Sequence, residues 1–338
     1  MTFKELAELW YTTHCFGLSY NWMKQVSSNI NHLCRFFGND EISEIKPYRV
    51  EEVLNSLSRY NPNTKKGASK RLLKAISNTV NQIFEFAVEN DMIVKNPACK
   101  AYKVIPKNAP TKTVTSITEY QRELVMMIDH PAKIAAILMM FMGLRTGEVL
   151  SLKWNDIDLN ELVINVRTSC ERVASNKYSI KFGTKNGKCR KVSIPSSVAE
   201  YLERQKLNSI SELVVNKDGR LHTPTTWKRT WKSYQFSLNY AVYKERCKKL
   251  GVEPKNKYSP TGIPDMNVRF NAHQLRHTFA TMLYLSGVDV LTAQELLGHA
   301  DAKTTLNIYT DLDKKFKKIN IIKFDHYIQN ELLKVSSL

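Results

Sequence analysis

One stretch without hydrophobic periodicity divides the chain into two parts. Residues 101–113, AYKVIPKNAPTKT, contain two prolines and three lysines. Proline interrupts both helices and sheets, and closely spaced lysines resist burial, so this stretch predicts an extended linker. We therefore expect one domain over residues 1–100 and a second over residues 114–338, and the apolar content suffices for a core in each.

The first domain is predicted to be all helical. Thr2 and Glu5 suit a capping box, Pro47 suits the first turn of a helix, and apolar residues recur at helical spacing in four segments. The fourth segment, from about residue 64 to 90, carries a basic run in its first turns, for which a solvated helix face is the alternative explanation. We take four residues of this run as candidates for binding a polyanion: Lys66, Lys70, Arg71 and Lys74.

The second domain has a mixed pattern. Residues 118–129 and 132–142 predict helices, and helices resume from about residue 196. Three short segments rich in β-branched residues predict strands, and the last two flank an Asn-Gly pair that is typical of a hairpin turn: 162–168, 177–182 and 189–195. The expected fold class is therefore mainly α with a small antiparallel β-sheet.

Charge points to the kind of partner. The formal net charge is +18, and the excess is concentrated in residues 61–112 and 217–257. Clustered lysine and arginine favour a polyanionic partner, most often nucleic acid. The six cysteines are scattered without a CxxC pair, which predicts free thiols in a reducing cytosol. Neither a membrane-length apolar run nor a signal-peptide pattern is present, so we expect an intracellular, soluble protein.

Arg145 is the first candidate for chemistry. It lies within FMGLRTGEVLSL, between an apolar helix that ends near Gly143 and a helix that starts near Thr146. An arginine between two apolar helices needs an anionic partner. Glu148, three residues further on, would supply one within the protein, so a structural arginine is the alternative to a ligand-binding one.

His273 and Arg276 are the second pair of candidates, in NAHQLRHTFATML. Asn271 suits a helix N-cap, Gly287 suits the helix end, and the two residues share a helix face. A planar guanidinium beside a further donor suits a phosphate. Two alternatives remain: a core histidine pair, and a zinc site through His273 and His277, which the cation between them opposes.

His299 and Tyr309 lie close together in LGHADAKTTLNIYTDL, residues 297–312. Leu297 ends a helix, Gly298 breaks it, and His299 projects from the turn. Two threonines, 304 and 305, are predicted to precede a short helix that carries Tyr309. Taken alone, Tyr309 fits a packed aromatic residue, but its place after the other candidates favours a role in chemistry.

These segments resemble the tyrosine recombinase (phage integrase) family. GLRTGE, HQLRHTFAT and LGHADAKTTLNIYT occur in the order and with the spacing of the family's three sequence boxes, and residues 1–100 resemble its core-binding domain, which ends in Asn96-Pro97. The family also has a lysine on a β-hairpin, for which TKNGK offers Lys185, with Lys188 and Lys181 as weaker candidates. The resemblance implies a helical core-binding domain, a mixed α/β catalytic domain and this catalytic set: Arg145, Lys185, His273, Arg276, His299 and Tyr309.

The resemblance also implies a reaction. Tyr309 would attack a DNA phosphate to give a 3′-phosphotyrosyl link, the arginines and histidines would stabilise the phosphate, and Lys185 would protonate the leaving 5′-oxygen. Neither a metal nor another cofactor is needed. A homotetramer would join two double-stranded DNA sites through a Holliday junction, with the tail 310–338 on a neighbouring subunit. We expect it to work on the nucleoid, with accessory DNA-bending or directionality proteins as further partners.

Two rival functions share this scaffold. A type IB topoisomerase would relax DNA by the same chemistry, and a non-catalytic protein would bind DNA alone. Two departures from the family are expected: the chain begins directly at the core-binding part, without an arm-binding domain, and residues 207–265, which include TWKRTWKSY, exceed the family core. The longer stretch is either an extra DNA contact or a loop insertion.

Overall fold

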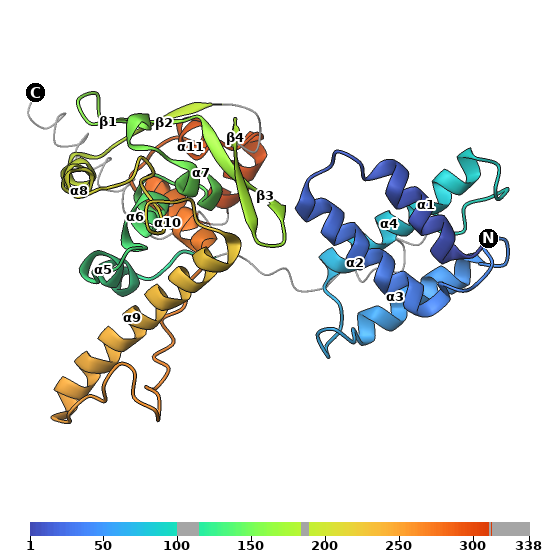
Figure 1. Ribbon diagram of the computed structural model, residues 1–338, viewed down its shortest axis with the longest axis horizontal. Coiled ribbons are helices and arrows are strands. Elements are labelled where there is room, and N and C mark those ends of the chain that lie inside the picture. Colours follow the sequence, from blue (N-terminus) through green and yellow to red (C-terminus); the bar gives the residue numbers. More distant parts are fainter. Residues whose placement is uncertain (100–114, 184–188, 311, 313–338) are drawn as a thin grey trace, which may run out of the picture. The chain divides into compact units, whose positions relative to one another are not determined.

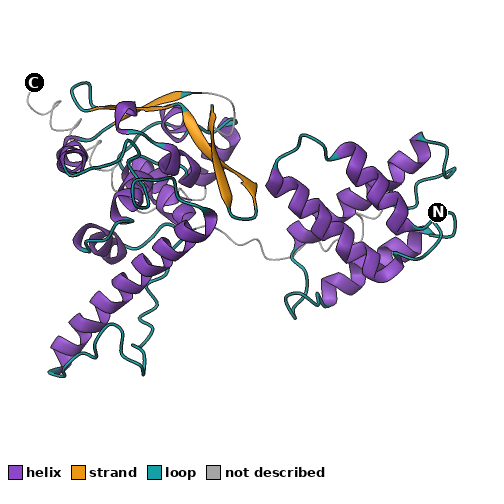
Figure 2. Cartoon of the chain, in the orientation of Figure 1, coloured by secondary structure: helices purple, strands orange, loops and turns teal. Residues whose placement is uncertain are grey.

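The computed structural model describes residues 1–99, 115–183, 189–310 and 312. The chain forms two compact units, Met1–Lys112 and Thr113–Leu338, and each is described by itself. Figure 1 follows the chain from blue to red, and Figure 2 shows that helices dominate both units. The predicted linker 101–113, Lys185, Lys188 and most of the tail 310–338 lie outside the described residues.

Unit 1 is a bundle of helices, as predicted. The Thr2 hydroxyl and the Glu5 carboxylate form the expected capping box, and Pro47 occupies the first turn of its helix. The buried faces of the helices share one core around Phe3, Leu33 and Phe84. The described residues of this unit form four helices: α1 (Phe3–His14), α2 (Tyr20–Phe37), α3 (Pro47–Arg59) and α4 (Lys70–Glu89).

Helix α4 starts later than the sequence predicts. The expected start was near residue 64, but Ser69 is the N-cap, and its hydroxyl accepts a hydrogen bond from the Leu72 backbone at 3.3 Å. Before it, Asn61 and Lys66 pair across a tight turn in which Lys65 has a positive φ. Lys66 is therefore a loop residue, whereas Lys70, Arg71 and Lys74 lie in the first turns of the helix.

Unit 2 is mainly helical with two small antiparallel sheets, where a single sheet was expected. One has the strand order β1-β2-β5 and the other pairs β3 with β4. Its helices share a second core around Ile137, Ile164 and Tyr234. The elements of this unit before the long helix described below are α5 (Glu119–Met127), α6 (Lys133–Phe141), α7 (Thr146–Ser151), the short 3-10 helix η2 (Trp154–Asp156), β1 (Ile157–Asp158), β2 (Val163–Val166), β3 (Thr168–Ala174), β4 (Lys177–Phe182), β5 (Arg190–Ser193) and α8 (Ser196–Leu207).

The strand pairing differs from the prediction. The segments 177–182 and 189–195 were expected to pair as one hairpin, but β4 pairs with β3 and β5 pairs with β2. The predicted strand 162–168 is divided at Arg167, whose guanidinium binds the Asp156 carboxylate, and the chain enters the other sheet from there. Strand β3 was not predicted because its sequence, TSCERVA, lacks a clear apolar alternation.

The long stretch 207–265 is mostly one helix with a returning loop. Helix α9 (Pro224–Leu250) has 27 residues, and in Figure 1 it extends from the rest of unit 2 with the loop beside it. The Tyr240 hydroxyl donates to the Lys255 carbonyl at 3.2 Å, and the Asn239 side chain bonds the Val268 backbone at 2.9 and 3.2 Å. These bonds fix the loop along the helix.

Three further helices complete the described part of unit 2. Helix α10 (Ala272–Leu285) begins at the predicted N-cap Asn271, and α11 (Val290–Leu297) ends at Gly298, which has the left-handed conformation that favours glycine. Residues 302–310 form a further helix. Among the helices of the described ranges, none combines the length and the apolar character that crossing a membrane requires.

Candidate active site

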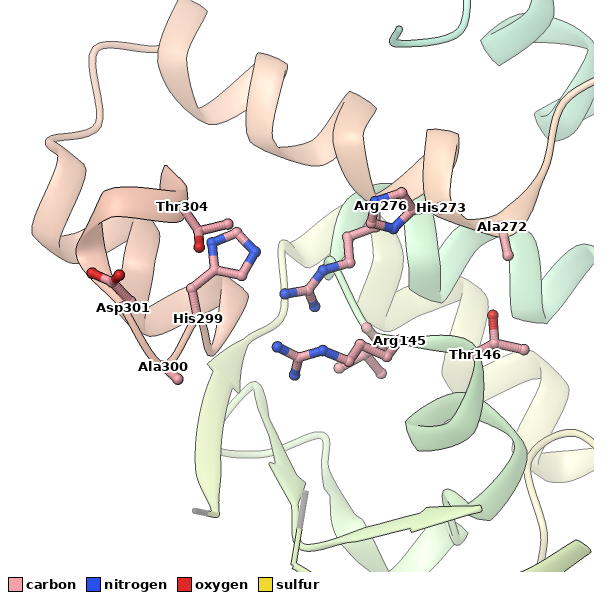
Figure 3. Close-up of a pocket in the computed structure, with 10 residues that line it drawn as sticks. Arg145, Thr146, Ala272, His273, Arg276, His299, Ala300, Asp301 and Thr304 are labelled. Carbon is pink, nitrogen blue, oxygen red and sulfur yellow. The ribbon is translucent and has the colours of Figure 1, made fainter. Parts of the chain in front are cut away.

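A pocket of about 490 Å³ gathers residues from all three predicted segments. Arg145 comes from the start of α7, His273 and Arg276 come from α10, and His299 comes from the loop after α11. Figure 3 shows the two guanidinium groups side by side, with the His299 ring next to them. Residues that lie 154 positions apart in the chain, from 145 to 299, thus meet at one concave surface.

Two hydrogen-bonding partners fix the side chain of Arg145. Its side chain donates to the Glu148 carboxylate at 2.8 Å and to the Gly298 carbonyl at 2.6 Å, and it remains 24% exposed on the pocket side. Gly143 permits the tight turn that precedes Arg145, because its φ is positive and a Cβ at this position would overlap the Phe279 ring. Arg145 is therefore paired with Glu148, as the structural alternative required, and it also lines the pocket.

Glu148 has a second cationic partner that sequence reasoning missed. Arg190 of β5 places both terminal nitrogens 2.9 Å from the two carboxylate oxygens, and its Nε donates to the Leu296 carbonyl at 3.2 Å. Burial opposes ionisation of Glu148, but Arg190 and then Arg145 outweigh it and lower the pKa of this carboxyl to about 2. In CRKVSIP nothing distinguishes Arg190 from a surface cation, so the sequence offered no signal.

These contacts define the arginine cluster: Arg145, Arg190 and Arg276 around the single carboxylate Glu148. Arg276 is 5% exposed and donates to the carbonyls of Gly143 and Leu297. Burial and then the nearby Arg145 lower its pKa to about 9, so it keeps its charge at neutral pH. Three cations against one anion leave a net charge of +2 next to the pocket, which suits an anionic ligand.

The two histidines differ in their surroundings. His273 lies at the pocket edge and much of its surface is exposed. Its pKa is lowered, first because the ring is partly desolvated and then because Arg276 and Arg145 are positively charged. His299 accepts or donates a hydrogen bond between Nδ1 and the Thr305 hydroxyl at 2.8 Å. Burial, and then Arg276 and Arg145, lower the His299 pKa to about 4, so its imidazole is neutral at pH 7.

The two threonines are not where the sequence placed them. They were expected before the helix that carries Tyr309, but this helix already includes residue 302, and both lie inside it. Thr305 is fully buried and orients His299, and Thr304 lines the pocket. The Asp301 side chain accepts a hydrogen bond from the Lys303 backbone at 2.8 Å, and this turn starts the helix earlier.

Tyr309 lies apart from the pocket. Its hydroxyl donates to the Val288 carbonyl at 3.1 Å, its ring packs edge-on against Tyr284 at 5.2 Å between centroids, and the residue is 6% exposed. Burial and then Asp289 raise the pKa of the phenol to about 12. The structure therefore brings Arg145, His273, Arg276 and His299 together, and it holds the hydroxyl of Tyr309 elsewhere.

The remaining predicted residues have separate positions. Lys185 and Lys188 lie outside the described residues, and Lys181 forms an ion pair with Glu171 across the β3–β4 sheet. In the described ranges no three potential metal ligands gather, and His277 does not line the pocket. In unit 1, Arg71 lines a polar hollow between α2 and α4, and neither Lys66 nor Lys74 is buried.

Comparison with known proteins gives these features a context. Residues 111–315 match the phage integrase family. A XerC-like tyrosine recombinase of Caldanaerobacter subterraneus subsp. tengcongensis is 30% identical over 291 residues, which are 82% of this chain and 70% of that protein. The ICEBs1 integrase of Bacillus subtilis is 25% identical over 298 residues, which are 87% of this chain and 74% of that protein.

Two solved structures share the fold. The Tn1549 transposon integrase in complex with a circular intermediate DNA superposes with a TM-score of 0.67 at 20% identity, over 91% of this chain and 95% of the other. A lambda integrase tetramer bound to a Holliday junction superposes with a TM-score of 0.59 at 17% identity, over 89% of this chain and 78% of the other. This likeness supports the predicted fold class, a mainly helical chain with a minor antiparallel β part.

Proposed function

The chain belongs to the phage integrase family and is a tyrosine recombinase, a DNA breakage-and-rejoining enzyme, and we propose that it works through a 3′-phosphotyrosyl intermediate at the pocket of Arg145, Arg276, His273 and His299. The observation that carries the proposal is the convergence of these four side chains around a net charge of +2. A phosphodiester acquires further negative charge in its transition state, and fixed donors stabilise that charge.

The bond changes follow from the chemistry of a phosphodiester. The Tyr309 oxygen forms a bond to phosphorus, the bond from phosphorus to the 5′-oxygen breaks, and the phenolic proton leaves through His273 or water. Lys185 donates a proton to the leaving 5′-oxygen. Attack by the 5′-hydroxyl of a second strand reverses these steps and frees Tyr309, so the backbone is rejoined without an external energy source.

Charge balance explains the composition of the arginine cluster. Glu148 anchors Arg145 through its backbone and side chain, but without Arg190 this carboxylate would cancel one of the two remaining cations and leave a net charge of only +1 for a phosphate. Arg190 supplies the second cation to Glu148, so Arg145 and Arg276 keep their charge for the ligand. His299, neutral and oriented by Thr305, adds a hydrogen bond to a phosphate oxygen.

Tyr309 has to change its partners before it reacts. Its hydroxyl is bonded to Val288 and its pKa is raised, which suits a resting state better than an attacking one. We propose that DNA in the pocket favours a rearrangement of residues 302–310 that brings the hydroxyl to the phosphate. Substrate-induced movements that complete the catalytic arrangement are common in enzymes.

The assembly is proposed by likeness. Four subunits on two DNA sites would exchange strands through a Holliday junction, with residues 310–338 contacting a neighbouring subunit, and DNA of the nucleoid in the cytoplasm would be the substrate. Within unit 1, Lys66, Lys70, Arg71 and Lys74 are proposed to contact DNA. The lysines and arginine near the start of α4 face no acidic residue in its first turn, and the positive end of the helix dipole favours an anionic partner there.

A suicide substrate, nicked near the cleavage site, tests the chemistry. The wild-type protein is expected to be trapped covalently on DNA, and Tyr309→Phe to give no covalent product while binding DNA nearly as well. Tyr284→Phe is the matched control, because it removes a neighbouring hydroxyl and should leave trapping intact. Trapping of Tyr309→Phe at the wild-type level would refute the assignment. Joining of two partner sites, rather than relaxation of supercoils alone, separates recombinase from topoisomerase.

A further inference from the structure

The segment TWKRTWKSY forms the first turns of α9 and presents two different faces. Trp227, Trp231 and Tyr234 pack inward, with ring centroids 5.5 and 5.7 Å apart along the row. The basic residues between them are exposed: Lys228, Arg229 and Lys232. Core packing therefore accounts for the aromatic residues of this segment and leaves its cations unexplained.

These three cations line a cleft together with Arg172 of β3. The cleft lies at the start of α9, beside the turn between β3 and β4, and Pro224 and Thr225 complete its lining. The Thr225 backbone donates to the Asn176 side chain at 3.0 Å, which ties the turn to the helix. Arg172 is positioned over the same turn, because its guanidinium donates to the carbonyls of Ala174 and Ser175.

The charge of this cleft is one-sided. Its lining contains four cationic side chains and no carboxylate, and in the described part of the chain Lys228, Arg229 and Lys232 form no ion pair with an acidic residue. The cations of the cleft repel one another. The first turn of α9 lacks an acidic residue, so the positive end of the helix dipole adds to this repulsion. A polyanion in the cleft would remove this repulsion.

We propose that this cleft binds backbone phosphates of duplex DNA at a place separate from the cleavage pocket. The two sites share no lining residue, and the cleft contains neither a histidine nor a tyrosine for chemistry. Its ligand is a row of phosphates, which the spaced cations follow without reading the bases. The inference rests on the proposed function for its ligand and concerns affinity, not the cleavage step.

Two triple variants with the same change in charge test the cleft. The first is Lys228→Ala/Arg229→Ala/Lys232→Ala, and the second is Lys244→Ala/Arg246→Ala/Lys248→Ala at the other end of the same helix. The salt dependence of DNA binding is measured for each. The cleft variant is expected to lose about 0.9 from the log–log slope for each lost phosphate contact, which is about fivefold in affinity per contact at 0.15 M salt.

Covalent trapping separates this proposal from the proposed function. At saturating protein, the cleft variant should be trapped on the suicide substrate at the wild-type rate, since its catalytic pocket is intact. Failure of wild-type trapping would contradict the chemistry, whereas a cleft variant with the wild-type salt slope would contradict only the cleft. An equal loss of slope in both triple variants would also overturn the cleft, because it would reveal a general charge effect.

The cleft can also be tested on the wild-type protein, so that the result does not depend on whether a variant folds. Lysine acetylation is mapped by mass spectrometry with and without the DNA site. DNA is expected to protect Lys228 and Lys232 severalfold more than Lys244 and Lys248 of the same helix. Equal modification of Lys228 and Lys232 in the two samples would overturn the proposal.

Discussion

The arginine cluster and the tyrosine proposed to act with it are held in opposite ways. Arg145 and Arg276 are fixed by carbonyls and by Glu148 with their charges at the pocket, so this half of the site is assembled before any ligand arrives. Tyr309 is also fixed, but its hydroxyl is bonded to Val288. Under the proposed chemistry, the groups that would recognise a phosphate are therefore preorganised, whereas attack by Tyr309 would require a conformational step.

The largest effect is expected for Lys185, which lies outside the described residues. Lys185→Ala should slow cleavage by about 10²- to 10⁴-fold if this lysine is the general acid. A 5′-bridging phosphorothioate supplies a leaving group that needs little protonation, so it should restore much of the lost rate. The rate of covalent trapping on the two substrates measures the rescue.

Two control comparisons show whether rescue by sulfur identifies the general acid. Arg276→Ala should recover much less than Lys185→Ala, because Arg276 is assigned to the charge of the phosphate. The same pair of substrates is applied to Lys188→Ala and Lys181→Ala. Rescue of Lys188→Ala, with normal cleavage by Lys185→Ala, would move the role to Lys188. If none of the three lysine variants is rescued, the general acid lies elsewhere.

The next effect tests whether the preorganised half depends on Arg190. Arg190→Ala leaves Glu148 with Arg145 alone, so the charge offered to the phosphate falls, and trapping at saturating DNA should slow by about 10²-fold. Glu148→Gln added to Arg190→Ala removes the uncompensated carboxylate and should recover part of the rate. Thermal unfolding of each variant shows which losses come from stability.

If the losses in trapping rate caused by Arg190→Ala and by Glu148→Gln simply added up in the double variant, charge compensation would be contradicted. In that case Arg190 would act only by supporting the fold around Leu296 and Gly298. Arg190→Lys is a useful third variant, since it keeps a positive charge and loses the two-pronged geometry. If charge is what matters, it should retain more activity than Arg190→Ala.

A smaller effect is expected from pH, because His299 is neutral in the free protein. A phosphate beside His299 raises its lowered pKa, so binding takes up a proton and DNA affinity should rise as pH falls from 8 to 5.5, by at most about tenfold per pH unit for one proton. Anisotropy with Tyr309→Phe protein measures this without cleavage. His299→Asn should flatten the profile, and an unchanged profile would count against a phosphate contact at His299.

The same lowered pKa sets the pH window for stability. A histidine whose folded pKa lies near 4 contributes stability above its usual pKa of about 6.5, and this contribution is lost as pH falls from there towards 4. Unfolding of the free protein by denaturant, repeated with His299→Asn, reports this contribution. The variant should lose less stability than the wild type over that interval.

The smallest expected effect is that of a chelator. EDTA should leave covalent trapping unchanged, because the arginine cluster supplies the positive charge that a metal would otherwise provide. The comparison is made at constant ionic strength on the same DNA. Loss of trapping in EDTA that zinc restores would favour the alternative built on His273 and His277.

Helix ends and other features that depend on neighbouring residues could be predicted from the sequence, whereas contacts between residues far apart in the chain could not. Asn271 caps α10 and Gly298 ends α11 because capping and left-handed turns depend on a few neighbouring residues. The bond between Arg190 and Glu148 joins residues 42 apart, and no periodicity marks it. Likewise, the place of Tyr309 after His299 favours chemistry, but it cannot say that the hydroxyl is bonded to Val288.

The bond between Tyr309 and Val288 also bears on genome safety. A protein with net charge +18 is attracted to DNA of every sequence, and if Tyr309 is the proposed nucleophile, its exposure would allow nicking at random sites. A hydrogen bond and an edge-on aromatic pair contribute about 0.5–1.5 kcal/mol each. Together they confine the released tyrosine to roughly 1–15% of free molecules. With Tyr309 as the proposed nucleophile, accidental damage at chance sites would fall to the same proportion, while a correct site that stabilises the released form would escape the restraint.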